Sequence, residues 1–234
     1  MKKLALFLAL ALLMTFVSCG KTEETAAPAD GENAEPTLTA GNEEPEAEAE
    51  PETVQMVGGW ALASSTELTP ELTEIFEKGF VAIDMNYEPV ACLATQTVAG
   101  KNYCFLARGG AAYCLAFLYW TFDGSVTLMN VARIGPDGAL EGEERVGGWS
   151  ATEDPAMTED VTTVFEKAVA GYEGGTFTPV AHLYTQVVAG LNHIYLCRSD
   201  AGYALVRVYA DLGGGAEITD VVDLDVGSLC TYGA

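Results

Sequence analysis

The feature that most constrains this chain is an internal duplication. The stretch PVACLATQTVAGKNY (Pro89–Tyr103) returns as PVAHLYTQVVAGLNH (Pro179–His193), with ten of fifteen positions identical. A shorter stretch, VGGW, also occurs twice, 89 residues apart. A period of about 90 residues is too long for a solenoid repeat and fits a small domain. We therefore expect two domains of one architecture, at residues 54–141 and 142–234.

Each unit predicts one helix ahead of its strands. In the first unit Thr69 stands at an N-cap position and Pro70 at the first helical position. In the second unit Thr158 takes the cap position. Apolar residues then recur at helical spacing on one face of each helix: Leu72, Ile75, Phe76 and Ile83 in the first, and Val161, Val164, Phe165 and Tyr172 in the second.

Strand patterns separated by glycine-containing turns follow each helix. In the first unit they are Val90–Gln96, Asn102–Arg108, Ala112–Trp120 and Val126–Ile134. A helix of about four turns has to bury its apolar face against another element. The predicted fold class is therefore α+β, with one helix packed across an antiparallel sheet of about four strands in each domain.

The N-terminus reads as an export signal. Lys2 and Lys3 precede an apolar stretch, Leu4–Val17, that is short for a membrane span and ends at Ser18-Cys19. This pattern resembles the lipobox of bacterial lipoproteins. The resemblance implies a signal peptide at residues 1–19 and acyl chains on Cys19 that tether the protein to a bacterial membrane. An ordinary secretory signal and an uncleaved anchor are the alternatives, and each places the rest of the chain outside the cytoplasm.

An acidic segment separates this leader from the repeats. Residues 20–53 contain eleven Asp or Glu, one Lys, four Pro and no aromatic residue. Such a composition predicts a disordered, self-repelling linker. Of the total net charge of −23, the leader contributes +2 and the linker −10, which leaves −15 for residues 54–234. A surface this acidic argues against nucleic acid as a partner.

The cysteines leave several pairings open. Five follow Cys19, which is an odd number for an oxidising compartment, and no CxxC motif predicts a zinc site. Cys104 and Cys114 flank the Gly109-Gly110 turn, so a cross-strand disulfide is one possibility. The pairing of Cys92, Cys197 and Cys230 is left open.

Two motifs resemble the cystatins, and more closely the stefins. A glycine pair ahead of the helix and a Gln-x-Val-x-Gly hairpin occur as Gly58-Gly59 with Gln96–Gly100, and again as Gly147-Gly148 with Gln186–Gly190. The resemblance implies tandem inhibitors that reversibly occlude the active-site cleft of papain-like cysteine peptidases. No GxSxG, HExxH, P-loop or GxGxxG motif occurs, and we expect no enzyme, no cofactor and no metal.

The resemblance also implies which residues bind the peptidase, and we expect the protein to be a monomer. A second turn in each unit would supply an apolar tip, Phe122 or Leu212. The second turns lack the Leu-Pro or Pro-Trp of the family, so a non-inhibitory adhesion or protein-binding module on the cell surface is the alternative. The expected contacts are Val57, Gly58, Gly59, Gln96, Thr97, Val98, Ala99, Gly100 and Phe122 in the first unit, and Val146, Gly147, Gly148, Gln186, Val187, Val188, Ala189, Gly190 and Leu212 in the second.

Overall fold

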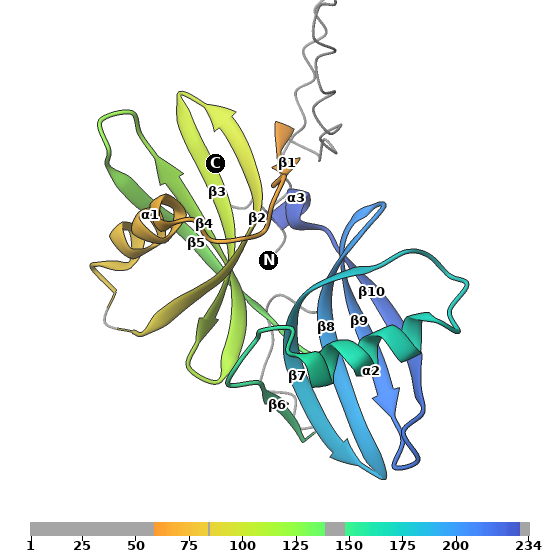
Figure 1. The fold of residues 1–234 in the computed structure, drawn as a ribbon. Coiled ribbons are helices and arrows are strands. Elements are labelled where there is room, and N and C mark those ends of the chain that lie inside the picture. Colours follow the sequence, from red (N-terminus) through yellow and green to blue (C-terminus); the bar gives the residue numbers. More distant parts are fainter. Residues whose placement is uncertain (1–58, 84, 139–147, 230–234) are drawn as a thin grey trace, which may run out of the picture. The chain divides into compact units, whose positions relative to one another are not determined.

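The computed structural model describes residues 59–83, 85–138 and 148–229, which belong to one compact unit. Two five-stranded antiparallel sheets dominate it, with strand orders β1-β2-β3-β4-β5 and β10-β9-β8-β7-β6 (Figure 1). The first sheet contains β1 (Ala61–Leu62), β2 (Tyr87–Val98), β3 (Gly100–Gly109), β4 (Ala112–Trp120) and β5 (Val126–Ile134). The second contains β6 (Trp149–Ala151), β7 (Thr178–Val188), β8 (Gly190–Ser199), β9 (Gly202–Ala210) and β10 (Ala216–Leu224).

The predicted helices form at the predicted starts. Helix α1 (Pro70–Phe80) begins after Thr69, whose side chain accepts a hydrogen bond from the Leu72 amide at 3.2 Å. Helix α2 (Glu159–Val169) begins after Thr158, and a short α3 (Val226–Leu229) follows β10. Both long helices end earlier than predicted. Ile83 and Tyr172 therefore lie beyond the helix ends, and Ile83 is 40% exposed.

The predicted fold class is wrong. We expected two cystatin-like domains, each a helix across about four strands, whereas the described residues form a sheet-rich fold of two five-stranded sheets. The reason is visible in β4, where every residue from Ala112 to Leu118 is buried. A helix covers one face of a sheet only, so a strand buried on both faces needs a second layer. The unbroken apolar run YCLAFLYW carried this signal in the sequence.

The second layer is supplied by the other sheet. Alternate residues of β4 point to different cores: Cys114, Ala116 and Leu118 pack with α1, while the intervening side chains join a core that contains residues of both sheets. Helix α2 covers the second sheet in the same way through Phe165 and Ala168. The fully buried members of the shared core include Leu93, Leu106, Tyr113 and Leu115 from the first sheet and Leu183 and Leu196 from the second.

Tyrosine hydroxyls tie the two sheets together inside the shared core. The Tyr184 hydroxyl donates to the Ile134 carbonyl at 2.7 Å and accepts from the Tyr113 amide at 3.1 Å. The Tyr203 hydroxyl donates to the Leu93 carbonyl at 2.9 Å. Buried backbone groups need such partners, because an unsatisfied one costs about 1–3 kcal/mol. The sheets are therefore held by specific bonds as well as by apolar contact.

The disulfide considered between Cys104 and Cys114 does not form. Cys104 lies in the shared core and Cys114 in the core under α1, so the two side chains point to opposite faces of the sheet. The four described cysteines, Cys92, Cys104, Cys114 and Cys197, form no disulfide with one another. Cys230 and Cys19, the predicted acylation site, lie outside the described residues. None of the described helices is long and apolar enough to cross a membrane.

A buried histidine pair distinguishes the second half from the first. Nδ1 of His193 lies 3.1 Å from Nε2 of His182, and both rings are nearly inaccessible to solvent. The ring of Tyr195 stacks against both. One nitrogen of the contact has to donate and the other accept, so the contact cannot hold two protonated imidazoles without repulsion. In the first half the same positions carry Cys92 and Tyr103.

The two hydrogen bonds of the Tyr184 hydroxyl predict that removing this hydroxyl lowers the stability of the protein. Tyr184→Phe removes one hydroxyl and leaves the Ile134 carbonyl and the Tyr113 amide without it inside a dry core. We expect the free energy of unfolding to fall by about 2–4 kcal/mol, in a transition that stays single because the halves share a core. Urea denaturation followed by tryptophan fluorescence measures this. A change below about 0.5 kcal/mol would show that the hydroxyl is dispensable.

The histidine pair predicts acid sensitivity. Burial, and next the charge of His193, lower the pKa of His182 from 6.5 to about 4, and burial also lowers the pKa of His193. The unfolded chain therefore binds more protons than the folded one between these values, so stability falls as the pH drops from about 6.5 to about 4. The slope is about 1.4 kcal/mol per pH unit for His182.

The chain itself offers the matched variant for this test. His182→Cys with His193→Tyr installs the residues that the first half carries at these positions. We expect the variant to unfold with a shallower pH dependence than the wild type between pH 6.5 and 4, as measured by thermal melts in a pH series. Parallel curves for the two proteins would contradict the assignment, because carboxylate titration is common to both.

Candidate functional site

The antiparallel path of each half brings three predicted segments to one end of its sheet. In a meander, successive turns alternate between the two ends of the sheet. The turn between β2 and β3 therefore lies at the same end as the turn between β4 and β5. The strand β1 runs antiparallel to β2, with Ala61 opposite Thr95, so Gly59 precedes it at that same end.

We call these sets the first rim and the second rim. The first rim consists of Gly59, the tip Thr97–Gly100 and the turn Thr121–Ser125. The second rim consists of Gly148, the tip Val187–Gly190 and the turn Asp211–Gly215. The tips are the ends of the β2–β3 and β7–β8 hairpins (Figure 1). In the tips Val98 pairs with Gly100, and Val188 pairs with Gly190.

Glycine is required at the end of each tip by close backbone contact. Gly100 has φ +140°, and a Cβ there would lie 2.3 Å from the Trp120 carbonyl oxygen. Gly190 has φ +138°, and its Cβ would lie 2.4 Å from the Ala210 carbonyl oxygen. Any side chain at these positions forces the hairpin away from the neighbouring strand. The glycine that closes each motif thus seats the tip against the strand that leads into the second turn.

One side-chain hydrogen bond within the hairpin occurs in both halves. Nδ2 of Asn102 donates to Oε1 of Gln96 at 2.6 Å, and Asn192 makes the same bond to Gln186 at 2.7 Å. The glutamine of the motif therefore bridges the two strands of the hairpin. In the first rim its Nε2 also lies beside Gly59, 4.0 Å from where a Cβ would stand.

Tyr119 and Tyr209 were not predicted as site residues. The hydroxyl of Tyr119 donates to the carbonyl of Ala99 at 2.6 Å, and that of Tyr209 donates to the carbonyl of Ala189 at 2.6 Å. Each tyrosine reaches from the third strand of the meander to the end of the first hairpin. Their occurrence at the same place in both repeats was the sequence signal available for finding them.

Large apolar side chains of both rims face solvent. Thr97, Ala99 and Ala189 are exposed as well. Trp120 packs edge-on against Phe122 with ring centroids 5.6 Å apart, whereas Ala210 stands at the position of Trp120 in the second half. Exposed apolar side chains gathered on one edge are typical of binding surfaces. The exposed fractions are 41% for Val98 and 76% for Phe122 in the first rim, and 82% for Val187, 45% for Val188 and 89% for Leu212 in the second.

The aspartates in the second turns accept hydrogen bonds from residues of their own turns. Asp123 accepts hydrogen bonds from the Thr121 hydroxyl and, at 3.0 Å, from the Ser125 amide. These bonds, the Thr121 bond first, lower the pKa of the Asp123 carboxyl. Asp211 accepts from the amides of Gly213 and Gly215 in the second rim. Both carboxylates therefore close their own turns, and the apolar side chain beside each is the one that projects.

Part of the predicted site lies outside the described residues. This holds for Val57, Gly58, Val146 and Gly147, which the resemblance places directly before the described glycines. Gly148 is described and exposed, and no atom lies within 4 Å of where its Cβ would stand. The structure therefore gathers the hairpin, the second turn and one glycine in each rim.

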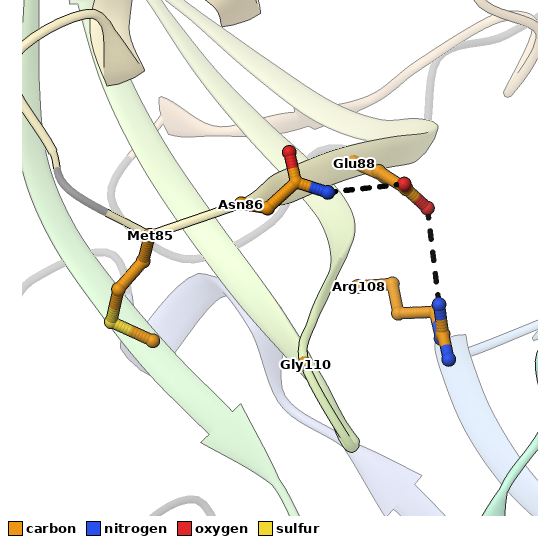
Figure 2. A pocket seen from close by; sticks show the side chains of 5 residues that line it. All are labelled: Met85, Asn86, Glu88, Arg108 and Gly110. Carbon is orange, nitrogen blue, oxygen red and sulfur yellow. Dashed lines mark hydrogen bonds and ion pairs between the residues drawn. The ribbon is translucent and has the colours of Figure 1, made fainter.

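A pocket lies at the opposite end of the first sheet. It has a volume of about 210 Å³ and is lined by Met85, Asn86, Glu88, Arg108 and Gly110 (Figure 2). Glu88 stands 3.9 Å from Arg108 across the β2–β3 pair and accepts a hydrogen bond from Asn86 at 3.2 Å. An exposed ion pair of this kind contributes little binding or stability.

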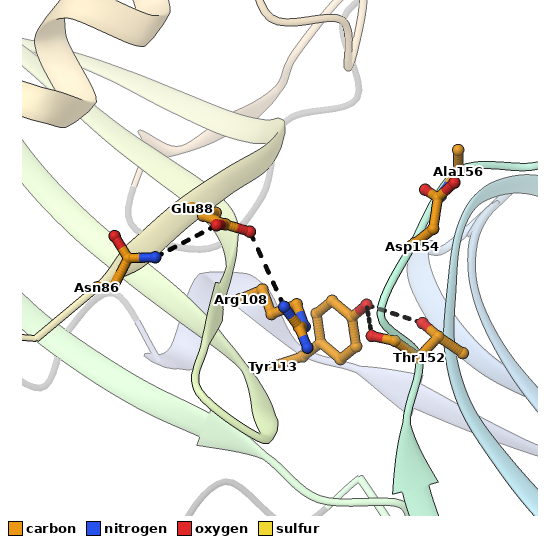
Figure 3. Close-up of polar contacts among 7 residues, drawn as sticks. All are labelled: Asn86, Glu88, Arg108, Tyr113, Thr152, Asp154 and Ala156. Atoms are coloured by element: carbon orange, nitrogen blue, oxygen red, sulfur yellow. Dashed lines mark hydrogen bonds and ion pairs between the residues drawn. The ribbon is translucent and has the colours of Figure 1, made fainter.

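The contacts beside this pocket belong to the sheet–sheet junction. Figure 3 shows Arg108 next to Tyr113, whose hydroxyl contacts the backbone oxygen of Thr152 at 3.0 Å and its hydroxyl at 2.8 Å. Asp154 accepts from the Ala156 amide at 2.9 Å and closes a local turn. These bonds account for the polar groups of Tyr113, Thr152 and Asp154, whereas Nε of Arg108 is buried without a hydrogen-bond partner among the described residues.

The described side chains form no metal site, and burial keeps two of the described thiols protonated. Burial raises the pKa of Cys92 to about 11 and that of Cys114 to about 12, which keeps both thiols protonated and weakly nucleophilic. Within the ranges described, no group of three or more His, Cys, Asp or Glu side chains is placed to hold a metal ion. The exposed apolar side chains of the two rims are candidate contact groups.

Comparisons with known proteins do not place the chain in a family. No protein-family model matches it, and no curated protein matches it. The rims and their chemistry are thus the basis for a functional proposal.

The close backbone contact at Gly100 predicts that a side chain at this position lowers the stability of the protein. Gly100→Ala drives a Cβ into the Trp120 carbonyl, so we expect the free energy of unfolding to fall by about 2–4 kcal/mol. Gly110→Ala is the matched control: Gly110 has φ +60° and open space around its Cβ position, and we expect a cost of about 1 kcal/mol. Urea denaturation of both variants checks this. Equal losses of free energy of unfolding in the two variants would show that the hairpin tip can move away from the Trp120 carbonyl without strain.

Proposed function

We propose that this protein is a reversible inhibitor of papain-like cysteine peptidases that occludes their active-site groove with its rims. The observation that carries the proposal is the exposure of apolar side chains on tight turns at one end of each sheet. Val98 and Phe122 project in the first rim, and Val187, Val188 and Leu212 in the second. When another protein's groove removes such side chains from water, the free energy of the complex is lowered.

The construction of the tips supports an inhibitor. A peptidase groove accepts substrates as extended chain, whereas each tip is a hairpin turn closed by Gly100 or Gly190 against a neighbouring backbone. A preformed turn loses little conformational entropy on docking. It also presents no extended peptide bond to an attacking thiolate. Both properties favour tight binding without cleavage.

The choice of peptidase class rests on the sequence motifs. Gln96–Gly100 and Gln186–Gly190 resemble the hairpin motif of the cystatins, and Gly59 and Gly148 stand where the glycine pair of that family precedes the helix. The glycines allow a partner's backbone to approach closely. Two rims in one chain support two such contacts.

We also propose an extracytoplasmic site of action. The support is the leader pattern that ends at Cys19 and the acidic linker at residues 20–53, which is suited to hold the folded part away from a membrane surface. Acylation at Cys19 would anchor the protein there.

Titration of papain with the purified protein tests the proposal. We expect stoichiometric loss of peptidase activity that competes with an active-site substrate. Replacing Val98-Ala99 and Val188-Ala189 by Asp-Asp should abolish inhibition, because either rim would then have to desolvate two carboxylates in a peptidase groove. The melting temperature should stay within a few degrees of the wild type, since these residues are exposed.

A matched control separates a rim effect from a general loss of exposed apolar surface. Val81 is 86% exposed beyond the end of α1, on the segment that leads to the far end of β2. Val81→Asp should therefore leave inhibition unchanged. Absence of inhibition by the wild type at micromolar concentration would overturn the proposal and favour the second candidate, a non-inhibitory protein-binding module that uses the same rims.

A further inference from the structure

We propose that Tyr119 and Tyr209 are positioning residues of the rims, which hold the tip carbonyls in hydrogen bonds that survive when a tip is buried by a partner. The inference rests on the proposed function and names the residues that make the tips fit for burial. It concerns groups outside the motif itself, because both tyrosines lie on the strand after the hairpin.

The geometry is the same in both repeats. Each hydroxyl lies 2.6 Å from a carbonyl oxygen at the apex of a tip, that of Ala99 or Ala189. The neighbouring residues differ between the copies: Trp120 corresponds to Ala210, and Lys101 to Leu191. The hydrogen bond is therefore present in both repeats although the neighbouring residues differ. This indicates that it does not depend on the particular side chains of either rim.

The hydrogen-bond donors available to the apex carbonyl differ between the free and the bound protein. Ala99 and Ala189 are exposed, so in the free protein water can replace a missing tyrosine hydroxyl. In a peptidase groove water is expelled from around the apex. A carbonyl without a donor then carries the full desolvation penalty. The hydroxyl thus contributes much more to the complex than to the free fold.

This difference predicts an effect on affinity without an effect on stability. We expect Tyr119→Phe, in a protein whose second rim carries Asp at Val188 and Ala189, to weaken papain binding by about 5- to 100-fold. The change should lie mainly in the dissociation rate, because the encounter surface is unchanged. The melting temperature should stay within about 2 °C. Tyr209→Phe, with Asp at Val98 and Ala99, should behave in the same way.

Another tyrosine of the chain provides a control that should change the melting temperature and leave the dissociation rate unchanged. The Tyr113 hydroxyl bonds to Thr152 in the junction of the two sheets, away from both tips. Tyr113→Phe removes an equivalent group, so it should lower the melting temperature and leave the dissociation rate unchanged. If Tyr119→Phe instead lowers the melting temperature with unchanged affinity, the tyrosine is merely structural and the inference is overturned.

A measurement on the free protein keeps this inference separate from the proposed function. Amide ¹⁵N relaxation reports the order of Val98, Ala99 and Gly100 in the full chain without any partner. We expect Tyr119→Phe to lower the order parameters of these three amides and to leave those of Val188–Gly190 unchanged. Equal order in variant and wild type would overturn the positioning role. Failure of the wild type to inhibit papain would overturn the proposed function, and the relaxation data would still decide whether the tyrosine holds the tip.

Discussion

The core shared by the two sheets is the interaction on which the rest of this structure depends. Each sheet has two apolar faces, and its own helix covers one of them. The other face, with Leu93, Leu106 and Leu115 in the first sheet, is buried only because the second sheet packs in the same core. Apolar burial of this extent is the dominant favourable term in folding. In this protein the duplication therefore supplies each half with the partner that buries its second apolar face.

Bonds between backbone and tyrosine give this core its specificity. Apolar contact alone is non-directional and allows sheets to slide against one another. Tyr184 and Tyr203 each place a hydroxyl on a backbone carbonyl of the other half, and Arg198 donates to the Ala63 carbonyl at 3.1 Å. A shifted arrangement would leave these polar groups unsatisfied in a dry interior.

The same frame carries two rims of different chemistry. The glycine, the amide bridge and the tyrosine hydroxyl recur in both halves, so the shape of the tips is conserved within the chain. The exposed groups vary: Phe122 packs on Trp120 in the first rim, while Leu212 and Val187 project in the second. The glycine, the amide bridge and the tyrosine are required by contacts that shape the backbone of the tip. The residues that face solvent are constrained only by what they bind.

Local patterns in the sequence determined the elements of this protein. The duplication, the cap at Thr69 and the four long strands of the first half were predictable, because caps, turns and apolar periodicity are properties of short segments. So was the hairpin that carries Gln96–Gly100. The roles of Tyr119 and Cys104 were not. Whether a side chain reaches a carbonyl 20 residues away, or points to one face of a sheet or the other, depends on register and on neighbouring strands. Tertiary structure alone decided that the sheets share a core, since a run of apolar residues shows that a strand is buried on both faces without showing what buries it.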